Sequence, residues 1–214
     1  MRPSIGRRMA AARVARVAFA VPAVAGLLAA CGSAPPTHFH SLLPAAADSR
    51  STPLPPQPAW ELLPVVVPAQ VDQPQWVLRL GDDSLAVLEN ERWIAPLGDE
   101  IRAALVERIG AALSAGTPVA LPAGGRAWRL GVEVRRFDSA PARYARLEVE
   151  WSLRARDGSA NLLRCRGVYE QAVSGGFPAL AAGHRTALAQ LGDALATALE
   201  AAAAGTPLSC PIAG

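Results

Sequence analysis

Two segments in the middle of the chain alternate between apolar and polar residues. Over residues 128–134, Trp, Leu and two Val alternate with Arg, Gly and Glu, and over residues 147–153 Leu, Val, Trp and Leu alternate with Glu, Glu and Ser. A period of two predicts β-strands with one buried face and one solvated face. The Asp157-Gly158 pair favours a hairpin turn, and a third strand is expected near residues 162–173.

The preceding part of the chain carries weaker strand signals. Residues 63–67 form a short apolar, β-branched run that Pro68 closes, which predicts a buried strand. Residues 76–80 alternate apolar with polar, and the turn signal Gly81-Asp82-Asp83 follows them. Residues 85–88 are therefore expected to return as the second strand of a hairpin.

Two segments have apolar residues at helical spacing. The first is predicted to begin at Pro96-Leu97, has Asp99 and Glu100 in its first turn, where the helix dipole favours acidic groups, and ends at Gly116. The second is predicted over residues 178–203 and is rich in alanine, which favours helix. The stripe positions are Ile101, Leu105, Ile109 and Ala112 in the first helix, and Leu180, His184, Leu188, Leu191, Leu195 and Leu199 in the second.

The order of these elements predicts a fold class. Strands come first, then a helix, then more strands, then the second helix, and no internal repeat is visible. This order predicts a single α+β domain with an antiparallel-rich β-sheet and two helices packed on one side. The stripe of the second helix is expected to pack on the apolar face of the sheet.

The first thirty residues differ in composition from the rest of the chain. They carry five arginines and no acidic residue, and residues 17–30 are uncharged. This is the pattern of a secretory signal peptide, because 14 uncharged residues fall short of the roughly 20 that a membrane-spanning helix needs. Leu28-Ala29-Ala30-Cys31 then resembles the lipobox of bacterial lipoproteins. We expect residues 1–30 to be a lipoprotein signal peptide and Cys31 to be lipidated; an ordinary signal peptide with a chance cysteine is the alternative.

Removal of the signal peptide would change the sign of the net charge. It takes five of the 21 basic residues and none of the 18 acidic ones, so the mature chain has 16 basic against 18 acidic residues and a net charge of −2. The chain contains no lysine and its arginines are dispersed, whereas nucleic-acid binding requires a basic patch or stripe. Nucleic acids are therefore excluded as partners.

The segment after Cys31 has the composition of a linker. Residues 31–58 are rich in proline, alanine and serine, which favours an extended and poorly packed backbone. We expect them to form a tether, within which residues 38–43 could form a short strand. The compact domain is expected to span residues 59–214.

Two cysteines remain once Cys31 carries lipid. Cys165 and Cys210 are then an even pair in an oxidising compartment, where disulfides form. A bridge between them would close a loop of roughly 45 residues and tie the C-terminal tail to the domain. One buried thiol and one free tail thiol are the alternative.

The residue types that carry catalysis or bind metals do not form a recognisable set. His38 and His40 would share one face of a strand, but a metal site usually needs three or four ligands, and no nearby Cys, Asp or Glu completes one. His184 is expected to pack in the core. The sequence has neither a Gly-x-Ser-x-Gly nucleophile motif nor a nucleotide-binding glycine pattern. We therefore expect no enzymatic activity, no cofactor and no metal.

The five tryptophans fall into two groups. Trp128 and Trp151 alternate with polar residues and are expected in the core. Trp60, Trp76 and Trp93 lie in the less regular half of the domain. They form either further buried packing or a candidate partner surface, because tryptophan is common in both settings.

Several short motifs along the mature chain together resemble one protein family. They are residues 31–42 (CGSAPPTHFHSL), 65–69 (VVVPA), 71–77 (VDQPQWV), 92–97 (RWIAPL) and 132–137 (VEVRRF). In this order they resemble the PqiC/YmbA-like lipoproteins, also called ABC-type transport auxiliary lipoproteins. The resemblance covers essentially the whole mature chain. It departs at His38-Phe39, where the family often has paired tyrosines, and at Gln73, where the family often has arginine.

The resemblance implies a location, a role and partners. It implies that residues 59–214 are a PqiC-like domain, held at the outer membrane by acyl chains (palmitate among them) and facing the periplasm. The protein would be a non-catalytic auxiliary component of an MCE/ABC-type intermembrane lipid transport system that supports membrane integrity. Its partners would be an MCE-domain protein and the inner-membrane permease, and self-association into a homo-oligomer is a further expectation because MCE proteins generally form rings. An envelope structural or assembly lipoprotein without a transport link is the alternative.

Overall fold

The computed structural model describes residues 35–44, 57–115, 127–158 and 163–210. The expected signal peptide and Cys31 lie outside the described residues, as does most of the expected tether. Residues from Thr37 onward form one compact unit. In chain order its elements are β1 (His38–His40), β2 (Trp60–Leu62), β3 (Gln75–Arg79), β4 (Leu85–Trp93), α3 (Leu97–Ala115), β5 (Trp128–Ala140), β6 (Tyr144–Ala155), β7 (Leu163–Ala172) and α4 (Phe177–Ala204).

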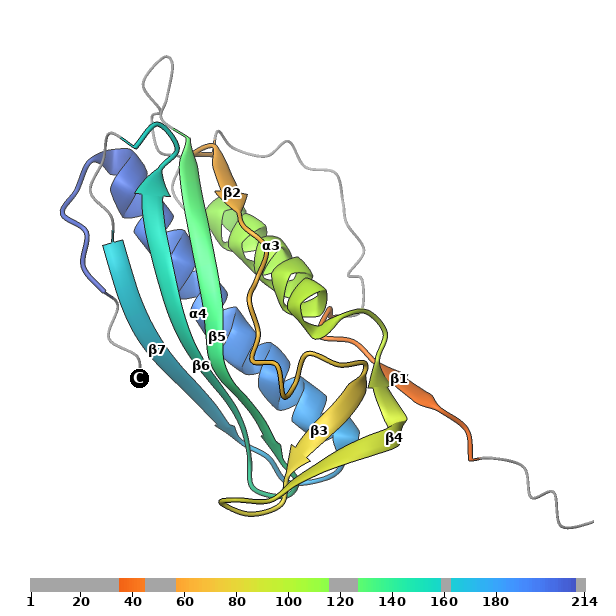
Figure 1. Ribbon diagram of the computed structural model, residues 1–214. Coiled ribbons are helices and arrows are strands. Elements are labelled where there is room, and N and C mark those ends of the chain that lie inside the picture. Colours follow the sequence, from red (N-terminus) through yellow and green to blue (C-terminus); the bar gives the residue numbers. More distant parts are fainter. Residues whose placement is uncertain (1–34, 45–56, 116–126, 159–162, 211–214) are drawn as a thin grey trace, which may run out of the picture. The chain divides into compact units, whose positions relative to one another are not determined.

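The strands form two sheets (Figure 1). The larger has the order β2-β5-β6-β7, in which β5, β6 and β7 run antiparallel and β2 runs parallel to β5. The smaller has the order β1-β4-β3, in which β3 and β4 are antiparallel and β1 runs parallel to β4. The strand expected within residues 38–43 is thus β1.

This architecture confirms the expected single α+β domain, and most of its strand pairs are antiparallel, as predicted. It differs from the prediction in having two sheets instead of one, each of which is mixed because it includes one parallel pair. The parallel pairs involve β1 and β2, which are only three residues long. Such strands are too short to show a period of two, so the sequence indicates only a possible strand at residues 38–43, gives no sign of β2, and does not reveal the partner of either strand.

Both helices lie on the same side of the larger sheet (Figure 1), as the sequence predicts. The stripe of α4 from Leu180 to Leu199 is buried against the inner face of β5, β6 and β7, and α3 packs beside α4. Gly192 brings the two helices close together, because a Cβ atom there would lie 2.6 Å from the Cγ atom of Arg108. No helix in the described part of the chain has both the length and the hydropathy to cross a membrane.

A β-bulge in β5 decides which of its residues face the core. Val134 and Arg136 pair with consecutive residues of β6, so Arg135 is an extra residue on β5. Beyond the bulge the side chains of Phe137 and Ser139 are buried, with exposed fractions of 4% and 0%. Without the extra residue they would point to the other face, because a shift of one position reverses every side chain of a strand.

The tail after α4 is attached to the larger sheet by a disulfide bond. Cys165 on β7 and Cys210 are bonded, with their Cα atoms 5.5 Å apart. This is the pair that the sequence leaves for a disulfide once Cys31 is assigned to lipid. The sulfur of Cys210 also lies 3.3 Å from the main-chain oxygen of Arg164, so Cys210 lies beside the first residues of β7.

Loss of this bond is expected to destabilise the domain. The two cysteines are 45 residues apart, and closing a loop of that length restricts the unfolded chain by about 4 kcal/mol in the loop-entropy model. We expect Cys210→Ser to lower the free energy of unfolding by an amount of that order in urea titrations of the mature protein. Reducing agent should destabilise the parent protein and leave the variant unchanged; equal sensitivity of both proteins would contradict the assignment.

Candidate functional site

Three segments that are distant in sequence meet in a hollow beside the smaller sheet. Its volume is about 420 Å³. Phe39 and Ile94 are the two large apolar side chains at this place that are mostly exposed, with exposed fractions of 58% and 60%. We call it the Phe39–Ile94 hollow; it is lined by Phe39, Asp72, Gln73, Pro74, Arg92, Trp93, Ile94, Ala95 and Pro96. These residues come from three of the motifs that carry the family resemblance.

The pairing of β1 with β4 positions the hollow. In the parallel register Phe39 is opposite Arg92 and His40 is opposite Trp93. The amide of Ile94 donates a hydrogen bond to the carbonyl of His40 at 2.9 Å, which extends the pairing past the end of β4. The amide of Trp93 donates to the carbonyl of Pro74, also at 2.9 Å, and thereby fixes the loop that precedes β3. The apolar residues of the hollow therefore sit on a hydrogen-bonded backbone.

A carboxylate between two imidazoles holds β1 in place. The Nδ1 atom of His38 lies 2.9 Å from Oε1 of Glu91, and the Nε2 atom of His40 lies 2.5 Å from Oε2 of the same residue. Burial raises the pKa of Glu91, but the hydrogen bonds and charges of His40 and His38 outweigh it and leave the pKa below its ordinary value. Glu91 is thus the acidic partner of the two histidines, which the sequence did not reveal because no acidic residue lies near them along the chain. Over the described residues, no group of three or more His, Cys, Asp or Glu side chains is arranged to hold a metal ion.

Aromatic rings pack beneath this carboxylate. The ring of Trp76 lies 4.3 Å from that of Trp93, 4.8 Å from that of His40 and 5.6 Å from that of Phe177, measured between centroids. Edge-to-face and tilted contacts of this kind stabilise an aromatic cluster beyond its buried area. The cluster joins both strands of the hollow to the first residue of α4.

The tryptophans expected as a partner surface are therefore mainly core residues. Trp76 and Trp93 have exposed fractions of 1% and 3%, so their rings do not form the partner surface and the alternative of buried packing applies. Trp60 is half-buried on β2, where it pairs with Trp128, and it packs against the core. The rings of Trp76 and Trp93 are withdrawn from water because β1 and α4 cover them. At the hollow, the large apolar side chains that remain mostly exposed are those of Phe39 and Ile94.

A buried hydrogen-bonded chain connects the aromatic cluster to α4. The indole Nε1 of Trp76 donates to the hydroxyl of Ser139 at 2.8 Å, and that hydroxyl lies 2.8 Å from Nε2 of His184. The imidazole of His184 stacks on Phe137 at 3.9 Å. Burial lowers its pKa to about 3, so the ring is neutral in the folded protein. Ser139 and His184 are both fully buried, so neither side chain is accessible to solvent.

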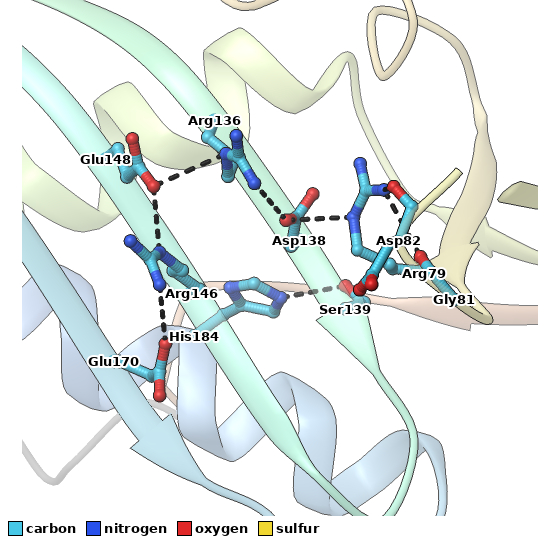
Figure 2. A network of polar contacts seen from close by, with 10 residues as sticks. All are labelled: Arg79, Gly81, Asp82, Arg136, Asp138, Ser139, Arg146, Glu148, Glu170 and His184. Atoms are coloured by element: carbon cyan, nitrogen blue, oxygen red, sulfur yellow. Dashed lines mark hydrogen bonds and ion pairs between the residues drawn. The ribbon is translucent and has the colours of Figure 1, made fainter. Parts of the chain in front are cut away.

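A ladder of opposite charges crosses the outer face of the larger sheet, near the hydrogen-bonded residues Trp76, Ser139 and His184 (Figure 2). Asp138, which is almost fully buried, contacts Arg79 of β3 at 2.9 Å and Arg136 at 3.4 Å. The ladder continues through ion pairs of 3.3, 2.8 and 3.1 Å. It consists of Arg79, Asp138, Arg136, Glu148, Arg146 and Glu170, and it ends on β7. The contact between Arg79 and Asp138 fastens the smaller sheet to the larger one.

Several residues of this site were missed by the sequence reasoning. Glu91 lies 51 positions from His40, and only the parallel pairing of a three-residue strand brings them together. Ile94 did carry a signal, since it follows the buried Trp93 and so points the opposite way along an extended backbone, whereas the neighbours of Phe39 are exposed or half-buried. Ser139 becomes an inward residue only because of the bulge at Arg135.

Comparisons with known proteins agree with the fold and with the family resemblance. Two crystal structures have this α+β architecture: that of an uncharacterized protein (TM-score 0.61, 19% identity, 76% of this chain and 98% of that chain) and that of protein XCC0632 from Xanthomonas campestris, of family DUF330 (TM-score 0.54, 19% identity, 74% of this chain and 92% of that chain). At this identity the likeness shows the fold alone. No curated protein sequence matches the chain.

The family model for the ABC-type transport auxiliary lipoprotein component matches residues 40–196. This is well over half of the chain, and it includes β4, α3, the bulged strand β5 and most of α4. The protein therefore belongs to the ABC-type transport auxiliary lipoprotein family, and the PqiC/YmbA-like resemblance is confirmed.

The buried state of His184 predicts an acid-sensitive fold. The unfolded chain binds a proton near pH 6.5, whereas the folded protein does so only near pH 3. Stability from the neutral ring is therefore complete above pH 6.5 and is lost as the pH falls toward 3, by up to about 1.4 kcal/mol per pH unit. His184→Gln keeps a polar group beside Ser139 but does not titrate. We expect the stability difference between parent and variant, from urea titrations between pH 7.5 and 4, to shrink on acidification; a constant difference would contradict this.

Glu91 is expected to control the attachment of β1. In Glu91→Gln a neutral amide replaces the carboxylate, and backbone amides of residues 38–40 should exchange with deuterium several-fold faster. Because the pKa of Glu91 is lowered, its contribution in the parent persists above about pH 4.5 and is lost as the pH falls through the lowered value. Glu89→Gln is the control, since Glu89 lies on the same strand but is mostly exposed. Equal exchange in both variants, followed by mass spectrometry, would rule out the role of Glu91.

Proposed function

We propose that this protein is the outer-membrane lipoprotein component of an MCE/ABC-type intermembrane lipid transport system, with a non-catalytic docking role in the periplasm. Its partners are an MCE-domain protein and, through it, the inner-membrane permease of the same system. The observation that carries the proposal is the Phe39–Ile94 hollow, an apolar surface built on an ordered backbone from family motifs. Its exposed apolar side chains are what a protein interface would bury.

The composition of the hollow suits a protein partner. Phe39 and Ile94 supply apolar area, and Arg92 and Asp72 supply one charge of each sign at its rim. Interfaces commonly combine an apolar centre with a polar rim, and arginine and aromatic residues are enriched in them. The ion pair of Arg92 with Glu89 is long, at 3.7 Å, while the Nε atom of Arg92 donates to the carbonyl of Glu89 at 3.0 Å; replacing the long ion pair by one to a partner carboxylate therefore costs little.

The anchor places a geometric limit on docking. Six residues lie between the expected lipidation site, Cys31, and His38, and an extended chain spans at most about 25 Å over those seven residue steps. The part of residues 31–58 that sets the reach of the domain is therefore only the stretch before β1. Acyl chains would supply the anchoring energy, at about 0.8 kcal/mol per buried methylene group, and they would keep the hollow near the membrane surface.

The non-catalytic role is supported by the placement of the residues that could do chemistry. Ser139 and His184 are buried and hydrogen-bonded to each other, and His38 and His40 are engaged with Glu91. Each has a structural role in joining β1, β3, β5 or α4. The alternative function, an envelope structural or assembly lipoprotein, would use the same surface for a partner outside any transport system.

Site-specific crosslinking in intact envelopes tests the proposal. A photo-reactive amino acid is placed at Phe39 or Ile94 in the full chain, and Val106 on α3 is the matched control because it is also apolar and exposed. We expect positions 39 and 94 to capture an MCE-domain protein, identified by mass spectrometry, and position 106 not to do so. Ile94→Asp, combined with the probe at Phe39, should reduce the yield several-fold because it places a charge in an apolar contact.

The outcomes separate the two functions. Capture of only outer-membrane or cell-wall proteins at positions 39 and 94 would overturn the transport role and favour the structural alternative. Yields at those positions no greater than at Val106 would show that the hollow does not dock a partner.

A further inference from the structure

The outer edge of β7 has the geometry of a strand that can pair with another chain. β7 is the last strand of the larger sheet and is ten residues long, whereas the strands at the other sheet edges have three to five residues (Figure 1). Within the described residues, no main chain pairs with this edge. A long unpaired edge is a template for strand addition unless the chain protects it.

The register with β6 identifies which backbone groups are free. The amide of Val173 donates to the carbonyl of Arg143 at 3.1 Å, so Val173 points toward β6. Because hydrogen-bonding direction alternates along an antiparallel strand, the main-chain groups of Arg166, Val168 and Glu170 point away from it. The carbonyl of Arg164 does so as well, which agrees with its contact to the sulfur of Cys210. Cys210 thus lies at the start of the edge, and no described residue forms a main-chain hydrogen bond with the outer side of the stretch from Arg166 to Ala172.

The side chains of this stretch are self-complementary. We propose that the edge pairs with the same edge of a second copy of this protein, antiparallel and about a two-fold axis at Val168. In that register Val168 faces its own counterpart, and Arg166 of each copy lies opposite Glu170 of the other. All three positions present outward backbone groups, so each opposed pair would exchange two main-chain hydrogen bonds. Opposite charges directly across such a pair stabilise it, and like charges destabilise it.

The charge ladder of Figure 2 gives a second argument for this occupant. It alternates in sign across the sheet and ends at Glu170, whose Oε2 atom contacts Arg146 at 3.1 Å. In the second copy the next residue would be Arg166, whose side chain is 83% exposed and contacts Glu150 at 2.7 Å. The alternation of sign would therefore continue without a break from one sheet into the other. Val168, 42% exposed in the single chain, would be covered at the centre.

This inference is independent of the proposed function and specifies an interface for self-association. A two-fold edge contact is closed, so it yields a dimer with one continuous eight-stranded sheet. Both copies would keep α3 and α4 on the same side of that sheet, since antiparallel pairing leaves the faces of the strands unchanged. The Phe39–Ile94 hollow lies on the smaller sheet and takes no part in the contact.

Cysteine crosslinking of the full chain in its native envelope tests the contact. Residues opposed in a hydrogen-bonded antiparallel pair have Cα atoms about 5.5 Å apart, a separation that a disulfide spans. Val168→Cys should therefore give a disulfide-linked dimer in several-fold greater yield than Val87→Cys. Val87 is the matched control because it is a strand valine of similar exposure (47%) on the other sheet. Equal yields would overturn the proposal, and so would crosslinking of position 168 to a different protein.

Charge reversal distinguishes crosslinks that form in this register from crosslinks that form because copies are crowded at a membrane. In the Val168→Cys background, Arg166→Glu or Glu170→Arg alone should reduce the dimer several-fold, because each creates two like-charge contacts. The double variant Arg166→Glu/Glu170→Arg should restore it, since opposite charges face each other again. Circular dichroism of each purified variant verifies folding, so that the rescue reports the contact. Single reversals without effect, or a folded double variant that fails to recover the dimer, would refute the two-fold register.

Discussion

Burial of the α4 stripe against the inner face of β5, β6 and β7 is the contact on which the other elements depend. The leucines at positions 180, 188, 191, 195 and 199 are 0–2% exposed, and each fully buried leucine contributes roughly 1.5–3 kcal/mol. In the described part of the chain α4 contacts β5, β6 and β7, and α3 is held mainly through α4. Gly183 allows this close packing, because a Cβ atom there would lie 2.9 Å from the Cβ atom of Ala145. The smaller sheet then attaches to a surface that α4 and β5 have already formed.

The smaller sheet is attached through aromatic packing and through two polar contacts. The bulge at Arg135 turns Ser139 toward the inner face of the sheet and Asp138 toward the outer face. Each of these two neighbours contacts a residue of β3. Ser139 accepts the indole proton of Trp76, while Asp138 pairs with Arg79. A buried polar group destabilises the fold when it lacks a hydrogen-bonding partner, and a paired one favours a single arrangement of the elements it joins. One extra residue in a strand therefore sets the position of the surface that we assign to partner docking.

The parts of the fold that sequence could predict are those with repeated patterns. Alternation in β5 and β6 and the leucine stripe of α4 are long enough for periodicity to be reliable, and they predicted the sheet, the helix and their contact. The sequence left Trp76 and Trp93 with two alternatives, buried packing or a candidate partner surface, because tryptophan is compatible with both. Deciding between the two required β1, a three-residue strand without a pattern, to cover them. The partner of His38 and His40 was hidden for the same reason, since Glu91 is remote in sequence.

The small size of β1 has a mechanical consequence. Three residues join β1 to β4, whereas the β5–β6 ladder pairs twelve positions of β5 with β6. If lipid holds Cys31 to a membrane, any load between the membrane and a docked partner passes through β1 before it reaches the main sheet. The weakest ladder would separate first, and Glu91 with its two imidazoles is what resists that separation. The domain would then yield by peeling a short strand, which lengthens its connection to the membrane while the core under α4 stays folded.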